Sequence, residues 1–178
     1  PVRPSVSWPM SGSAAAFASA VRSMGKQANA VVKKSQSLAP ELIERYNASG
    51  CGDIFIEPEQ AKELITQKTL LIITDTHNSR LLESEEIYLE AKISVVIDHH
   101  RKLIDHIDNA VIFYSEPFAS SASEMVTELA QYIDGASLSR LDAESLLAGI
   151  MLDTKNFVFN AGVRTFEAAA YLKRLGAD

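Results

Sequence analysis

The chain has 178 residues, of which 47% are hydrophobic and 22% charged, and its formal net charge is −6. This length and composition predict one soluble globular domain with a sizeable core, and the single cysteine, Cys51, excludes an internal disulfide and fits a reducing compartment. The acidic balance argues against nonspecific binding to long nucleic acids, and no apolar run is long enough to span a membrane. Since the chain begins at Pro1 without a methionine, we expect it to be a piece of a longer protein.

Strands and helices alternate along the chain. Small residues from Gly12 to Met24 predict a close-packed helix that ends at Gly25. Apolar runs predict strands at residues 28–32, 53–56, 69–74, 92–97 and 110–114, and further helices at residues 40–47, 58–65, 120–133, 139–152 and 164–175. The alternation predicts an α/β fold with a mainly parallel sheet flanked by helices, in which ligands bind beyond the carboxyl ends of the strands.

Acidic and imidazole side chains stand where two strands and one helix end. The three clusters are Asp75-Thr76-His77, Asp98-His99-His100 and Asp153-Thr154-Lys155-Asn156. Because neighbouring parallel strands end at the same sheet edge, we expect the first two clusters to meet there, where crowded carboxylates repel one another unless a cation binds between them. Carboxylate oxygens combined with imidazole nitrogens suit manganese, iron, cobalt or zinc better than calcium.

Taken singly, most of these residues have a simpler explanation. Asp75 or Asp153 alone is typical of a turn or a helix cap, and His77 alone is typical of a loop residue. The run Asp98-His99-His100 has no obvious packing use, and the chain has only four histidines in total. That run therefore carries the prediction of a metal site.

Two further acidic residues favour a structural interpretation. Glu124 and Glu128 stand four residues apart in the predicted helix 120–133, a spacing typical of a solvated helix face. His106 is predicted to be a surface residue. We expect none of the three to take part in the chemistry.

Three segments resemble motifs of the DHH phosphoesterase family in order and spacing: "LLIITDTH", "VVIDHHRK" and "LLAGIMLDTKNF". Two more, "EPFASSASEMVTEL" and "RTFEAAAYLKRLGAD", resemble the bacterial cyclic-di-AMP phosphodiesterases that carry membrane helices and PAS, degenerate GGDEF, DHH and DHHA1 domains. The similarity covers residues 12–178. It implies that residues 1–178 are a DHH domain without its DHHA1 partner domain, from the cytoplasmic part of a membrane-anchored bacterial protein.

The resemblance also implies roles for individual residues in a two-metal hydrolase that typically uses manganese. In that pattern Asp75 bridges the two ions, and His99 and Asp153 bind one of them. His100 faces the scissile phosphate, and Asp98 orients the imidazoles. The candidates for binding the substrate are Arg101, Lys155, Asn156 and His77. For the first three, an exposed polar surface role is the equal alternative, and for His77 the alternative is a satisfied loop residue.

One family motif is not matched. The family has a histidine, three residues, an aspartate, one residue and a second aspartate before the small-residue helix, and counting back from Gly12 these positions hold Arg3, Ser7 and Pro9. One ion would keep only Asp75, so we expect this chain to bind one ion or none and to be weakly active or inactive. A naturally defective homologue, an altered or truncated start and wrongly assigned residues 1–10 remain open as explanations.

The predicted function is hydrolysis of cyclic di-AMP to the linear dinucleotide pApA, crippled by the unmatched motif. The alternatives are a short-oligonucleotide phosphoesterase of the nanoRNase type, a family II pyrophosphatase, a RecJ-like exonuclease and a non-catalytic nucleotide-binding regulatory module. The exonuclease is least favoured, because a long single strand needs a basic, aromatic groove. Small residues in "SSASEMVTEL" would also suit a homodimer interface.

Overall fold

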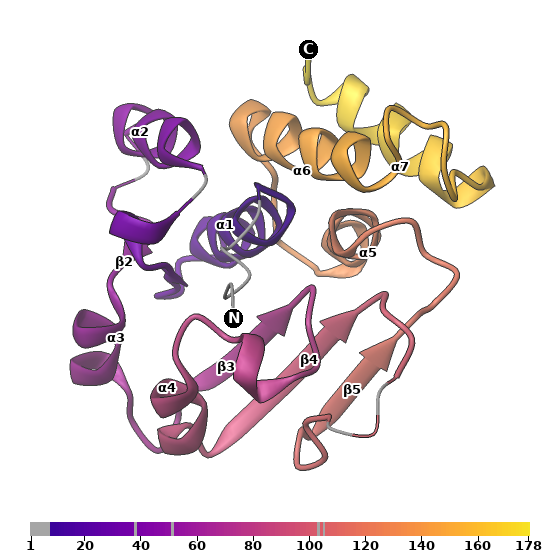
Figure 1. Cartoon of the computed structure of the whole chain (residues 1–178). Coiled ribbons are helices and arrows are strands. Elements are labelled where there is room, and N and C mark those ends of the chain that lie inside the picture. The colour runs from indigo at the N-terminus through magenta and orange to yellow at the C-terminus, as the bar shows by residue number, and fades with distance from the viewer. Residues whose placement is uncertain (1–7, 38, 51, 103, 105) are drawn as a thin grey trace.

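The computed structural model describes residues 8–37, 39–50, 52–102, 104 and 106–178 (Figure 1). Its helices are α1 (Trp8–Ser23), α2 (Pro40–Ala48), α3 (Pro58–Leu64), α4 (Glu85–Glu90), α5 (Ala122–Tyr132), α6 (Arg140–Asp153) and α7 (Val163–Arg174). Its strands are β1 (Ala30–Val31), β2 (Phe55–Ile56), β3 (Leu70–Thr74), β4 (Ile93–Asp98) and β5 (Ile112–Ser115). Every element predicted from the sequence is present, with shifted ends.

Three short elements were not predicted. They are α4 and the 3-10 turns at Lys34–Gln36 and Ser79–Leu81. Helix α4 begins because the Ser84 side chain accepts a hydrogen bond from the backbone N–H of Ile87, and two glutamates occupy its first turn, where the helix dipole favours negative charge.

All strand pairs are parallel, which confirms the predicted α/β class. In the larger sheet, of order β3-β4-β5, Ile72 pairs with Val95 and Val96 pairs with Phe113. Strands β1 and β2 form a separate two-stranded sheet. The described strands therefore lie in two sheets rather than in one.

Helices stack in layers over one face of the larger sheet. Figure 1 shows α1 and α5 next to the sheet and α6 and α7 beyond them. Ile97 of β4 packs against Met125 of α5, whereas Leu146 and Ile150 of α6 pack among α1, α5 and α7. Gly12 permits a close approach of α1 to α6, since a Cβ there would lie 3.1 Å from the Ser145 carbonyl oxygen. Among the described helices, none combines the length and apolar character that a membrane crossing requires.

The prediction of a solvated face for Glu124 is wrong. Its side chain is 1% exposed, and its Oε2 accepts hydrogen bonds from the Ser120 hydroxyl at 2.6 Å and the Thr165 hydroxyl at 2.7 Å. Glu128 is 24% exposed and is ion-paired with Arg164 at 2.6 Å. Helix α7 covers this face of α5. The spacing of Glu124 and Glu128 places them on one face of the helix but does not indicate whether another helix packs against that face.

Candidate metal centre

Asp75 is the first residue after β3 and continues its ladder, because its backbone N–H donates to the Ile97 carbonyl at 2.9 Å. Its φ is 67°, in the left-handed region that aspartate tolerates better than most residues and that recurs at functional sites. The side chain is 8% exposed. The strand end therefore fixes a buried carboxylate at the carboxyl edge of the sheet.

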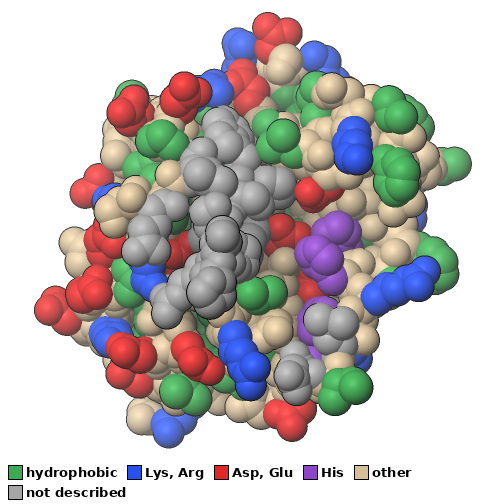
Figure 2. All heavy atoms as spheres, in the orientation of Figure 1, with side chains coloured by type: hydrophobic (Ala, Val, Ile, Leu, Met, Phe, Trp, Pro, Cys, Tyr) green, Lys and Arg blue, Asp and Glu red, His purple; other side chains and the backbone are tan. Residues whose placement is uncertain are grey.

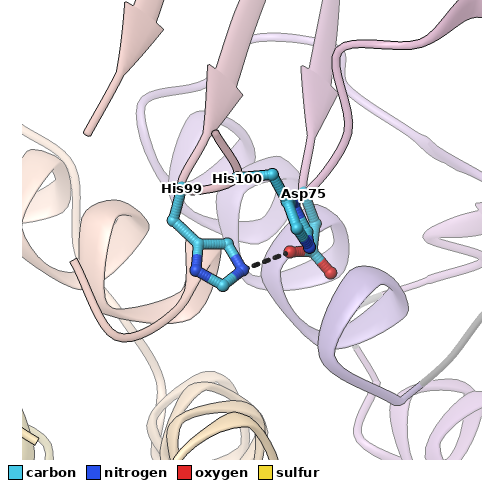
Figure 3. Close-up of side chains that lie close together, drawn as sticks. All are labelled: Asp75, His99 and His100. Atoms are coloured by element: carbon cyan, nitrogen blue, oxygen red, sulfur yellow. Dashed lines mark ion pairs between the residues drawn. The ribbon is translucent and has the colours of Figure 1, made fainter. Parts of the chain in front are cut away.

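The paired histidines follow the neighbouring strand, so parallel pairing brings them to the same edge. Figure 3 shows His99 aimed at Asp75, with Nε2 of the imidazole 3.2 Å from Oδ1 of the carboxylate. The His99 and His100 ring centroids are 4.3 Å apart. One ligand atom from each of Asp75, His99 and His100 lies within 4.8 Å of the other two, so a single cation could reach all three.

Asp153 reaches the same region from the end of α6. Burial raises the pKa of its carboxyl from 3.8 to about 6, and the negative charge of Asp75 adds to that rise. Oδ2 of Asp153 is buried and has no hydrogen-bond partner within the described residues. Oδ1 of Asp75 is also buried without a hydrogen-bond partner there, and its contact with His99 is an ion pair. Buried carboxylate oxygens of this kind fit a divalent cation.

The predicted metal ligands were Asp75, His99 and Asp153. The structure brings Asp75 and His99 together as expected, and the compact group includes His100 in place of Asp153. Asp153 is an electrostatic neighbour of the group. The individual ligand roles stay predictions.

The two imidazoles are held by different carboxylates. Burial alone would lower the pKa of His99, but the hydrogen bond and charge of Asp75 outweigh burial and raise it. The pKa of His100 is raised chiefly by its hydrogen bond to Asp98. Both rings are therefore easier to protonate in the metal-free chain than an imidazole in water.

Asp98 lies behind the histidines and is fully buried. Its Oδ1 accepts a hydrogen bond from the backbone N–H of His100 at 3.1 Å and contacts Nδ1 of the same residue at 2.7 Å. Its Oδ2 contacts Nδ1 of His77. Although burial would raise the pKa of Asp98, the hydrogen bonds from His100 and His77 outweigh burial and lower it. The carboxylate thus orients His100 and His77, and its predicted catalytic role stays a prediction.

His77 was predicted to touch substrate. Its side chain is 3% exposed, contacts Asp98 and packs near Phe113 with ring centroids 6.1 Å apart. Substrate contact by His77 stays a prediction, and this placement favours support of Asp98 instead. No sequence pattern indicated the His77–Asp98 contact.

The other predicted substrate residues, Arg101, Lys155 and Asn156, are exposed. Lys155 and Asn156 have φ values of 49° and 58°, so the backbone leaves α6 in the left-handed region. Thr154, which the sequence did not single out, holds this turn: its hydroxyl donates to the Ile150 carbonyl at 2.6 Å and accepts from the Phe157 N–H at 2.9 Å. Exposure suits both substrate binding and a plain surface role, so these roles also stay predictions.

The unmatched motif lies beyond what the structure describes. Arg3 and Ser7 fall outside the described residues, and the side chain of Pro9 is not described either. On the face seen in Figure 2, histidine side chains reach the surface with acidic side chains beside them. The described part of the site is therefore accessible from outside.

Fold and site together define an α/β domain with a group of carboxylate and imidazole side chains, able to hold a metal ion, at the carboxyl edge of a parallel sheet. The chain belongs to the DHH family, because residues 11–151 match the model of that family's N-terminal domain. This match confirms the family that was predicted from the sequence. It also confirms the predicted class of enzyme, since the family consists of phosphoesterases, which are hydrolases.

Named relatives agree with that membership. The chain is 44% identical over 173 residues to the cyclic-di-AMP phosphodiesterase GdpP of Geobacillus thermodenitrificans, covering 94% of this chain and 26% of that protein. It is also 44% identical over 124 residues to the cyclic-di-AMP phosphodiesterase PdeA of Listeria monocytogenes, covering 69% of this chain and 19% of that protein. The chain thus spans about a quarter or less of the length of these relatives.

A solved structure shows the same fold. An exopolyphosphatase-related protein from Bacteroides fragilis superposes with a TM-score of 0.80 at 23% identity, covering 98% of this chain and 51% of that one. At this identity the likeness shows the fold alone.

Proposed function

We propose that the chain is the DHH domain of a metal-dependent phosphodiesterase that hydrolyses cyclic di-AMP to pApA. The observation that supports this most is the Asp75–His99–His100 group at the sheet edge, in a chain 44% identical over 94% of its length to a cyclic-di-AMP phosphodiesterase. Manganese is the proposed metal, since the donors combine carboxylate oxygens with imidazole nitrogens.

A divalent metal held by Asp75 and His99, with Asp153 as a further ligand, would supply the positive charge that makes a water acidic and stabilises the phosphoryl oxygens. Asp75 and Asp153 face that charge with oxygens that lack hydrogen bonds in the described part. In the reaction, water oxygen adds to phosphorus, the bond from phosphorus to the 3′ oxygen breaks, and a proton ends on the released 3′ hydroxyl. Asp75, His99 and Asp153 would hold the positive charge of the metal next to the attacked phosphate.

His100 is proposed to bind the scissile phosphate. Its Nδ1 contacts Asp98, so only Nε2 remains for an outside group. The negative charge of Asp98 favours the protonated imidazole, which can donate a hydrogen bond to a phosphoryl oxygen. His77 contacts the other oxygen of Asp98 and thereby fixes its orientation.

The proposed activity of this chain is weak, because Arg3, Ser7 and Pro9 stand where the family motif has ligands. The family match begins at residue 11, directly after these positions, which supports this reading. We propose one bound ion instead of two. For the longer protein, a DHHA1 domain in cis, membrane anchoring and homodimer formation belong to the same proposal.

Restoring the motif tests the proposal. The triple variant Arg3→His, Ser7→Asp, Pro9→Asp should bind a second Mn²⁺ per chain and hydrolyse cyclic di-AMP roughly tenfold or more faster than the parent, as one well-placed catalytic group typically contributes at least that much. Adding His99→Ala to the triple variant should remove the gain. A restored variant with no second ion and no faster hydrolysis would contradict the proposal.

A non-catalytic nucleotide-binding module is the alternative that the unmatched motif favours. It predicts that the parent chain binds cyclic di-AMP without cleaving it, and that restoration changes neither property. Assays with short oligonucleotides and pyrophosphate alongside cyclic di-AMP distinguish the other hydrolase alternatives, because each substrate carries a different phosphate linkage.

A further inference from the structure

The turn between α6 and α7 has an unusual backbone. Lys155, Asn156 and Phe157 follow one another with φ values of 49°, 58° and 65°, and Asn160 has a φ of 49°. Consecutive residues other than glycine are uncommon in the left-handed region, since each Cβ then lies too close to the following carbonyl oxygen. A backbone of this kind persists where the surrounding structure holds it, and it recurs at functional sites. The turn is therefore a candidate for a functional segment.

Contacts with both helices hold this turn in place. The Phe159 N–H donates to the Thr154 carbonyl at 2.7 Å, which closes the turn back onto the end of α6. The Phe157 ring stacks on Phe166 of α7, with ring centroids 5.5 Å apart and ring planes 20° apart. The backbone of Phe159 is thus fixed relative to α6, the helix that ends at Asp153.

The turn presents apolar side chains to the outside. Val158 is 81% exposed and Phe159 is 59% exposed, and the nearby Leu152, Val163 and Phe166 are also more than half exposed. In Figure 2, hydrophobic side chains gather in the region that α7 occupies in Figure 1. Exposed apolar side chains that gather in one place mark a binding surface for a ligand or a partner.

This surface lies beside the candidate metal centre. The charge of Asp153, the last residue of α6, acts on His99 and His100. Because the Phe159 N–H bonds to the carbonyl of Thr154, the residue after Asp153, the Cα atoms of Phe159 and Asp153 lie within about 10 Å of each other. Figure 2 shows histidine side chains and the hydrophobic side chains on one face of the molecule. A ligand with its phosphate at the metal centre could therefore reach the turn.

A cation accompanies the exposed ring. The ammonium nitrogen of Lys155 lies 5.5 Å from the centroid of the Phe159 ring, which is a cation–π distance. Lys155 is itself exposed, so its ammonium group is accessible to a phosphate. A nucleotide carries a flat base beside a negatively charged phosphate, and unpaired bases stack on phenylalanine rings. The aromatic ring and the positive charge together favour a nucleotide over a purely apolar partner.

We propose that the Phe159 ring is a stacking platform for one adenine base of the bound dinucleotide. The left-handed turn positions the ring, so the base reaches it while the phosphate of the same nucleotide lies at the metal centre. Phe159 thereby selects nucleotides over phosphate esters that lack a base. The inference rests on the proposed function, because it takes a nucleotide as the ligand of this site.

Two ligands separate the contribution of the base from that of the phosphate. AMP and ribose 5-phosphate share the sugar and the phosphate, and only AMP carries a base. In calorimetric titrations with Mn²⁺ present, the chain should bind AMP roughly tenfold more tightly than ribose 5-phosphate, since stacking on one ring contributes a factor of that order. Phe159→Leu should weaken AMP alone and remove the difference, and Phe159→Trp should keep it. The matched control Tyr132→Leu, at an 86% exposed position at the other end of α5, should change neither affinity.

A fluorescence measurement distinguishes stacking from a structural role of the ring. In Phe159→Trp, AMP should quench the emission of the added indole beyond any change in the parent chain, and ribose 5-phosphate should not. Equal affinities of the parent for the two ligands, or an equal loss of both in Phe159→Leu, would overturn the inference and leave the proposed function standing. A chain that binds neither AMP nor cyclic di-AMP with Mn²⁺ present would contradict the proposed function and this inference with it.

Discussion

Buried carboxylates occur in two contrasting settings in this chain. Asp142 is fully buried, and its oxygens accept hydrogen bonds from the Tyr46 hydroxyl at 2.8 Å, the Ser19 hydroxyl at 2.8 Å and the Ser139 N–H at 2.8 Å. Asp75 and Asp153, by contrast, are close enough to repel and keep buried oxygens without hydrogen-bond partners in the described part. A satisfied carboxylate is part of the scaffold, and an unsatisfied pair is prepared for a ligand.

The two settings also differ in what they do to stability. The donors around Asp142 compensate for its burial, so removing it leaves several groups unpaired. At the sheet edge, burial and repulsion between the carboxylates of Asp75 and Asp153 destabilise the ionised form of Asp153, as its raised pKa shows. The substitutions below should therefore change stability in opposite directions at the two places.

The largest effect is expected at Asp142. Asp142→Ala should lower the free energy of unfolding by about 3 kcal/mol, because the Tyr46 hydroxyl and the cap of α6 lose a buried charged partner. Urea unfolding followed by circular dichroism measures the change. Asp134→Ala, at an exposed position, is the matched control and should change stability by less than about 0.5 kcal/mol. If Asp142→Ala lowered the free energy of unfolding no more than Asp134→Ala does, Asp142 would not be the stabilising, satisfied carboxylate described above.

The next effect concerns metal affinity. Asp75→Asn and His99→Ala should each weaken Mn²⁺ binding roughly hundredfold, about 2.7 kcal/mol, because the first removes the negative charge of the group and the second removes one of its donor atoms. Neither should lower the melting temperature of the metal-free chain appreciably, in contrast to Asp142→Ala. Calorimetric titration provides the affinity. His106→Ala, outside the group, should leave it unchanged.

Glu124 extends the contrast to α5. Glu124→Ala should cost about 2 kcal/mol of unfolding free energy, since it leaves the Ser120 and Thr165 hydroxyls without their buried acceptor. Glu128→Ala removes a half-exposed ion pair with Arg164 and should cost about 0.5 kcal/mol. Equal costs in denaturant unfolding would show that α7 does not bury Glu124 as described.

The smallest effect has the opposite sign. The folded chain holds the proton of Asp153 more tightly than the unfolded chain does, since its pKa is raised from 3.8 to about 6, so ionisation lowers stability as the pH rises through that window. Asp153→Asn should therefore stabilise the metal-free chain by about 1 kcal/mol at pH 7, after a discount for solvent screening, and by nothing near pH 4. Thermal melts at the two pH values measure this. A destabilised Asn variant at pH 7 would show that the carboxylate is satisfied after all.

The fold was largely predictable because its elements carry strong local signals. Apolar runs such as residues 69–74 identify strands, and Gly25 ends the first helix as expected, with a φ of 75°. Helix α4 was missed because six residues, four of them charged or aromatic, are too few to show a helical period. The division into two sheets depends on contacts between distant segments, which local patterns do not record.

The site was predictable only to the extent that topology determines it. Asp75 and His99 meet because parallel strands end at one edge, and that rule needs only the order of the elements. The contact of His77 with Asp98 and the burial of Glu124 depend on what packs against each residue. Helical spacing assigns residues to a face of the helix, and only the tertiary structure shows whether that face is covered.

The most direct test of the central claim is a Mn²⁺ titration of the purified chain at pH 7.5 and pH 5. We expect one ion per chain, bound more weakly at pH 5, because the raised pKa values of His99, His100 and Asp153 let protons compete with the metal. We also expect that binding is lost in His99→Ala. The absence of binding at pH 7.5, or binding that His99→Ala and Asp75→Asn leave unchanged, would contradict a metal centre at this edge of the sheet.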